Sequence, residues 1–171
     1  MSEAPDYIEP FEAWRVWKVV RYDCEYRLCS VVRRTVWPVG QALAAECLRA
    51  RGLIARLRRT GAHHAPDVGC ECGIYGARLD VAGEYLAEEP ASVACVIGRV
   101  ALWGTVVECQ YGFRASRAYP TRIYLPVDAG RRWRVAWDEI ALGLARYRVP
   151  IETLPCAARD TVGVLAARQA A

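Results

Sequence analysis

The distribution of apolar and polar residues predicts a β-hairpin near the start of the chain. Aromatic and β-branched residues dominate 11–20, a composition that favours a strand. A turn is expected over 22–25 and a second strand over 26–36, which ends where Pro38 removes a backbone donor. The preceding residues 1–10 lack such a pattern and are interpreted as a loose lead-in.

The segment 41–59 fits two descriptions. Its Ala, Leu and Arg content favours a helix, although Gly52 weakens the case for one unbroken element. Alternatively, residues 41–47 form a strand that ends at Cys47, and a helix begins after it.

About three helices are expected. The first follows residue 73 and should end before Pro90, because apolar residues recur there at helical intervals, namely Ile74, Ala77, Val81 and Tyr85. Asp138 is a good N-cap for a second helix, whose apolar stripe consists of Trp137, Ile140, Ala141, Leu144 and Ala145. The Ala-rich tail from Ala157 could form a terminal helix, but we expect it to fray.

Further strands are predicted in the second half of the chain. Residues 92–104 are nearly all apolar or β-branched, as in a strand buried on both faces, and Gly98 permits a bend or a close backbone approach. Strands over 105–110 and 113–119 are expected to pair as a hairpin across Tyr111-Gly112.

Together these elements predict a single α+β domain over 11–155, with a mainly antiparallel, partly closed, β-barrel-like sheet and a C-terminal tail over 156–171. Two small lobes divided near Pro126 are the alternative. Over 11–126 the order of hairpin, helix, glycine-punctuated strands and returning hairpin is similar to the small β-barrels of the PUA-like and SH3-like groups. This resemblance implies a fold only, and no functional residue follows from it.

Composition adds that the chain is an ordinary globular protein. It has 171 residues, of which 54% are hydrophobic and 25% charged. No apolar run reaches transmembrane length, and the acidic N-terminus does not fit a signal peptide, so we expect a cytoplasmic protein without a membrane partner. In that compartment the eight cysteines are expected to be reduced thiols or metal ligands.

The basic residues are almost all arginine, because Lys18 is the only lysine among 23 Lys and Arg residues. Combined with abundant Ala and Val, this usage is typical of a GC-rich bacterial genome. The net charge of +4 permits nucleic acid binding without requiring it. Arginines are densest over 49–59, which is either a phosphate-contacting face or a solvated helix face.

The strongest chemical signal lies at 63–75. The only two histidines, His63 and His64, precede Cys70 and Cys72, and turn residues separate them. Thiolates and imidazole are the preferred ligands of Zn²⁺, which takes four in a tetrahedron. We therefore predict a structural zinc site that pins this loop, with Cys47 as the fourth ligand and His63 slightly favoured over His64.

Two other interpretations of this cluster stay open. The cysteines can be small buried hydrophobic residues beside a surface loop, or they can form a thiol redox site. Catalysis is disfavoured, since the chain has no phosphate-binding glycine loop, GxSxG, HExxH or deaminase pattern. Glu71 is the one candidate acid–base residue near the metal ligands, and its side chain should point away from them.

Aromatic residues at predicted bends suggest a binding surface. Trp37 precedes a proline, Trp103 precedes a glycine, and Tyr111 lies on a hairpin tip. With Arg56, Arg58 and Arg59 they could bind nucleic acid by stacking and phosphate contacts. Equally, the aromatics could form a contact patch of a protein-interaction or scaffold module, and Trp103 could belong to the core. A metal-dependent enzyme or small-ligand binder is the third and weakest hypothesis.

Overall fold

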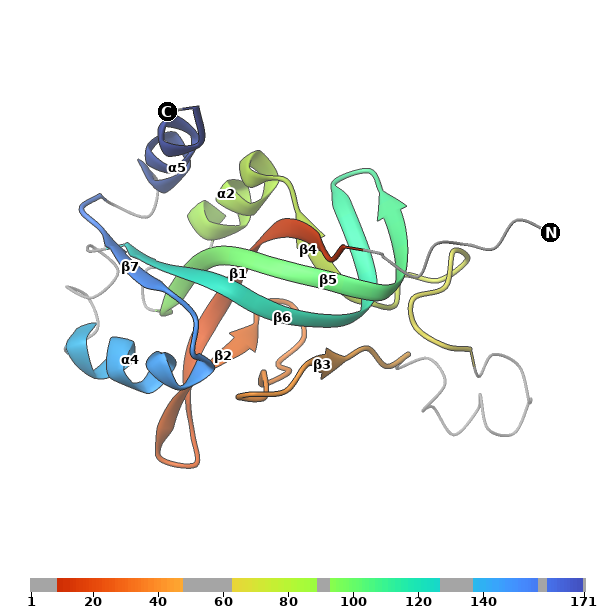
Figure 1. Cartoon of the computed structure of the whole chain (residues 1–171), viewed down its shortest axis with the longest axis horizontal. Coiled ribbons are helices and arrows are strands. Elements are labelled where there is room, and N and C mark those ends of the chain that lie inside the picture. Colours follow the sequence, from red (N-terminus) through yellow and green to blue (C-terminus); the bar gives the residue numbers. More distant parts are fainter. Residues whose placement is uncertain (1–8, 48–62, 89–92, 127–136, 157–159, 171) are drawn as a thin grey trace.

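The structure is a computed structural model that describes residues 9–47, 63–88, 93–126, 137–156 and 160–170. Its seven strands are β1 Phe11–Tyr22, β2 Glu25–Ser30, β3 Leu43–Ala44, β4 Ile74–Ala77, β5 Cys95–Cys109, β6 Gly112–Pro126 and β7 Ile151–Leu154. Three α-helices and one 3-10 helix accompany them within these ranges: α2 Leu79–Glu88, α4 Trp137–Leu144, η2 Ala145–Tyr147 and α5 Thr161–Ala170 (Figure 1).

Backbone hydrogen bonds run in a ring through four of the strands. β1 pairs antiparallel with β4 and β5, and both of these pair antiparallel with β6. β2 extends β1 as a hairpin, β3 lies beside β6, and β7 pairs in parallel with β6, which makes the sheet mixed. The α+β class is therefore confirmed, and so is the expected number of about three helices within the described residues. A PUA-like or SH3-like barrel stays a prediction.

Strand β1 separates two hydrophobic cores. Because successive side chains of a strand point to opposite faces, Ala13 and Trp17 enter a main core, which also takes in α4. Trp14 and Val16 enter a second core under α2 and α5. Figure 1 shows α2 and α5 on one side of the ring of strands and α4 on the other. The C-terminal tail is packed at Leu165, which is buried in the second core.

Residues 74–77 form strand β4, so the predicted helix begins at Leu79 instead of Ile74. Ile74 and Ala77, at the two ends of β4, have the spacing expected of a helix. This segment nevertheless lies between β1 and β6 and pairs with both. Gly76 lies against the side chains of Ala13 and Leu102, where a Cβ atom would not fit. Close packing against the sheet therefore overrides the local helical pattern.

The ambiguous segment 41–59 resolves in part. Leu43–Ala44 is strand β3 and leads to Cys47, as the strand interpretation expects, while residues 48–59 lie outside the described part of the chain. The second strand of the first hairpin stops at Ser30, before its predicted end. Residue 36 then returns to it through an isolated bridge with Cys29.

The strands predicted over 92–104 and 105–110 form one continuous strand, β5, and those after the turn at Tyr111 form β6. Irregular register near Arg99 and Trp103 lets these long strands bend. Gly98 lies against the backbone carbonyl of Arg122, which confirms the predicted close approach. In the described part of the chain, every helix is too short or too polar to cross a bilayer.

Tyr147 joins η2 to the first hairpin. Its hydroxyl donates to the Trp37 carbonyl at 2.8 Å and accepts from the Leu28 amide at 3.1 Å, and the side chain is fully buried. Burial raises the pKa of Tyr147 to about 12. A raised folded-state pKa contributes stability that is present below the ordinary value of about 10 and lost as pH rises toward 12.

We expect Tyr147→Phe to lower the free energy of unfolding by about 1–3 kcal/mol, because two buried backbone groups lose their partner. The variant should also lack the fall in stability between about pH 10 and 12 that this group causes in the parent. Denaturant titrations at several pH values measure both effects. Tyr111→Phe, at an exposed tyrosine, serves as the control; equal stability losses in the two variants would contradict this role for Tyr147.

Candidate metal centre

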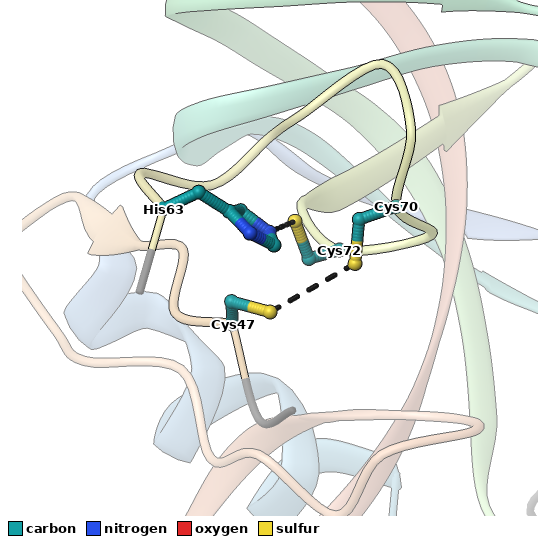
Figure 2. Close-up of side chains that lie close together, drawn as sticks. All are labelled: Cys47, His63, Cys70 and Cys72. Atoms are coloured by element: carbon teal, nitrogen blue, oxygen red, sulfur yellow. Dashed lines mark hydrogen bonds between the residues drawn. The ribbon is translucent and has the colours of Figure 1, made fainter. Parts of the chain in front are cut away.

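Two separate segments bring the candidate ligands together, and both are fixed to β6. Cys47 follows β3, which pairs with β6 at Leu43 and Ala44. His63, Cys70 and Cys72 belong to the loop that precedes β4, and β4 pairs with β6 at Ile74–Ala77. Figure 2 shows the three cysteine side chains and His63 turned toward one another from these two segments.

Four donor atoms, one from each of these residues, lie within 4.8 Å of one another. The Sγ atoms of Cys47 and Cys70 are 3.8 Å apart, and His63 Nε2 is 3.2 Å from Cys72 Sγ. In a tetrahedral zinc site, two sulfurs about 2.3 Å from the metal are about 3.8 Å apart, and a sulfur and a nitrogen about 3.5 Å. The cluster could therefore hold a metal ion with only small side-chain movements.

The cluster is shielded from solvent. Cys47, Cys70 and Cys72 are buried and His63 is half-buried. His64 is exposed and outside the group, which settles which of the two neighbouring histidines joins the cysteines. Glu71 is also exposed, so the one acidic side chain between the two cysteines does not face the cluster.

Turns in the loop present Cys70 and Cys72 to the same point. The Asp67 carboxylate accepts from the Gly69 amide at 2.9 Å, and the Asp67 carbonyl accepts from the Cys70 amide at 3.2 Å. Gly73 has φ of 121°, a value that strains residues with a side chain. This glycine bends the chain between Cys72 and β4. Such a bend is needed if Cys70 and Cys72, which have one residue between them, are to reach the same metal ion.

The pKa values of the Cys70 and Cys72 thiols are shifted in opposite directions. A hydrogen bond from the backbone of Cys72 is the main reason that the pKa of the Cys70 thiol falls to about 7. Burial is the main reason that the pKa of the Cys72 thiol rises. Since a metal binds thiolates, Cys70 is the cysteine of this pair that is more readily deprotonated for ligation.

Arg114 of β6 stabilises the loop over 63–73 by hydrogen bonds to its backbone. Its guanidinium is buried, and Nη1 donates to the carbonyl of Cys70, to that of Cys72 at 3.1 Å and to that of Asp67 at 3.3 Å. If the cluster held a metal of charge +2 on three thiolates, its net charge would be −1, which this cation would offset. Sequence reasoning did not single out Arg114, because its partners are backbone groups of a distant loop.

We expect Arg114→Met to weaken zinc binding about 10–100-fold, the usual cost of losing a group that orients metal ligands. Arg114→Lys keeps the charge and a donor and should recover part of this loss. Competition against a chromophoric chelator measures the affinity. Arg117→Met, an exposed arginine on the same strand, is the matched control; parent-like affinity in Arg114→Met would show that the loop holds its shape alone.

The predicted stacking surface is not assembled as expected. Trp37 is fully buried in the main core, where its ring lies perpendicular to that of Trp17, so the expectation that it is exposed is wrong. Trp103 is half-buried on β5, and Tyr111 is exposed at the tip of the β5–β6 hairpin. The arginine candidates lie outside the described residues; they are Arg56, Arg58 and Arg59.

Comparisons of the chain with protein-family models, with curated proteins and with solved structures found no match. What the described residues show is a group of three cysteines and one histidine that could hold a metal ion.

Proposed function

We propose that this protein is a non-catalytic binding module whose loop over 63–73 is fixed by one structural Zn²⁺ ion. The observation that carries the proposal is the convergence of four donor atoms, from Cys47, His63, Cys70 and Cys72, within 4.8 Å. These ligands come from two segments far apart in the sequence, so the metal would join segments that the sheet alone only places near each other.

The donor set favours zinc and a structural role. Three thiolates and one imidazole are soft or borderline ligands, and tetrahedral sites of this composition select Zn²⁺ among common divalent ions. All four positions of the tetrahedron would be filled by protein atoms. A catalytic zinc keeps one position open for water or substrate, and this cluster supplies no such position.

Elemental analysis of protein purified without chelator tests the proposal. We expect about one zinc per chain, and a cobalt-substituted protein should show the absorption of a tetrahedral ion with thiolate ligands. Cys24→Ser, which changes an exposed cysteine in the first hairpin turn, should leave both results unchanged. A zinc content near zero would refute the metal site.

We further propose that the target of this binding module is a nucleic acid. Two exposed tyrosines support it: Tyr75 on β4 is 43% exposed and Tyr111 at the hairpin tip is 56% exposed. The net charge of +4 adds a weak attraction for phosphates. A protein-interaction module would use the same aromatics as an apolar contact, and it remains the alternative.

Salt dependence separates these two targets. Single-stranded DNA and RNA affinities should fall steeply between low and moderate salt if phosphates are bound, whereas an apolar protein contact should change little. Tyr111→Ala should weaken stacking by about 1–3 kcal/mol per base at every salt concentration. If neither nucleic acid binds at low salt, the protein-interaction alternative is favoured.

A further inference from the structure

A second feature of the molecule, separate from the metal centre, is a pocket of about 270 Å³ between β1, β5, β6 and α5. Its polar lining comes from Glu12, Arg99, Thr121, Arg122, Arg168 and Gln169. Trp14 and Tyr124 form its buried aromatic side. Arginines from three different elements thus line one small space.

The pocket has an excess of positive charge. Arg99 binds the Glu12 carboxylate through Nη2 at 2.6 Å and Nε at 3.2 Å. Arg122 and Arg168 share a single carboxylate, that of Glu152, with Arg168 Nη1 at 3.0 Å. Three arginines are therefore paired with two carboxylates, of which only that of Glu12 belongs to a residue that lines the pocket. Since a guanidinium has five N–H donors, each arginine keeps donors beyond those that these ion pairs use.

Arg99 is held in place before any ligand arrives. Its guanidinium lies 4.9 Å from the centre of the Trp14 ring, and Trp14 stacks on Tyr124 with ring centroids 5.8 Å apart. The Glu12 carboxylate that anchors Arg99 also accepts from the Thr121 hydroxyl at 3.2 Å. A cation fixed on one side by a carboxylate and on another by a ring loses little freedom when it binds an anion.

We propose that this pocket binds a phosphate group. A tetrahedral oxyanion presents several oxygens in different directions, which suits donors that converge from β5, β6 and α5 better than a planar carboxylate does. The volume is below the range of pockets for drug-sized ligands, yet it exceeds the share of about 30 Å³ that one water takes in the liquid. The ligand is therefore free phosphate or the terminal phosphate of a larger molecule.

Two variants with opposite expected effects test this proposal on the full-length protein. Arg168→Gln removes a cation and should weaken the binding of inorganic phosphate, measured by calorimetry at constant ionic strength, about tenfold or more. Glu152→Gln breaks the same ion pairs but removes a competing anion, so it should tighten phosphate binding. Arg117→Gln, an exposed arginine elsewhere on β6, should have no effect.

The opposite signs distinguish a binding site from a structural ion-pair network. If the arginines only anchor α5, both variants should lower thermal stability and neither should change phosphate binding, which would overturn the proposal, as would a parent protein that binds no phosphate. A 5′-phosphorylated dinucleotide and its unphosphorylated form identify the source. Tighter binding of the phosphorylated dinucleotide than of inorganic phosphate assigns the pocket to a nucleic acid end; tighter binding of inorganic phosphate assigns it to the free ion.

Discussion

Cys70→Ser is expected to reduce zinc affinity more than about 100-fold, because loss of a group that merely orients a ligand already costs about 10–100-fold. Serine is a poor ligand for Zn²⁺ at this position, and only three donors would remain. Because the ligands are assembled only in the folded chain, metal-binding free energy is also folding free energy. We therefore expect a marked fall in thermal stability alongside the loss of zinc.

Zinc content, chelator competition and thermal unfolding of the parent and variant measure this prediction. Treatment of the parent with a strong chelator should reproduce the lower stability of the variant, and added zinc should restore the parent alone. Cys24→Ser controls for loss of a thiol at an exposed site. Full zinc affinity in Cys70→Ser would eliminate this ligand set, and full affinity in Cys47→Ser would eliminate Cys47 as its fourth member.

Trp37→Ala is expected to cost about 3–5 kcal/mol, as truncation of a large buried aromatic usually does. The ring is fully buried and packs at 5.4 Å and 89° on Trp17. Its Nε1 donates to Ser30 Oγ at 3.1 Å, so the variant also leaves a buried hydroxyl without this partner. In a chain of this size the midpoint of thermal unfolding should fall by roughly 6–20 °C.

Chemical denaturation gives the free-energy change, and circular dichroism gives the midpoint. Tyr111→Ala is the comparison, since this aromatic is exposed and its loss should change stability by less than about 0.5 kcal/mol. If Trp37→Ala instead kept parent stability and lost affinity for a single-stranded nucleic acid, the ring would belong to a binding surface and not to the core.

The sequence pointed to the four residues of the candidate metal cluster because their chemistry is rare in this chain. Two histidines and two cysteines within ten residues leave few alternatives, and Cys47 was the nearest further thiol. The choice between His63 and His64 was harder, because two adjacent residues have almost the same sequence distance to Cys70 and Cys72. Burial decides it, because only His63 faces the three thiols.

Other features depend on contacts between distant segments and escaped local reasoning. The bend before Pro38 suggested an exposed Trp37, whereas its ring packs on Trp17 in the core and its backbone carbonyl accepts a hydrogen bond from Tyr147. Arg114 looked like one more surface arginine of an arginine-rich chain, but it binds three loop carbonyls. Neither outcome has a signature in residue spacing, since both arise only when the strands are brought together.

The assignment of 11–155 to one domain stays a prediction. Limited proteolysis tests it: a domain of this extent should resist division, while clean cleavage over 126–132 into two stable fragments would favour two lobes.

The ring of strands also has a kinetic consequence. It closes through the pairing of β1 with β5, in which Phe11 lies opposite Leu102, so the chain must bring remote segments together before the ring can form. Closing long loops costs chain entropy before the new contacts compensate for it. Proteins with such non-local pairing therefore typically fold in roughly milliseconds to seconds instead of microseconds. Stopped-flow refolding of the zinc-bound protein should fall in this slower range, and microsecond refolding would show that the ring assembles from local contacts.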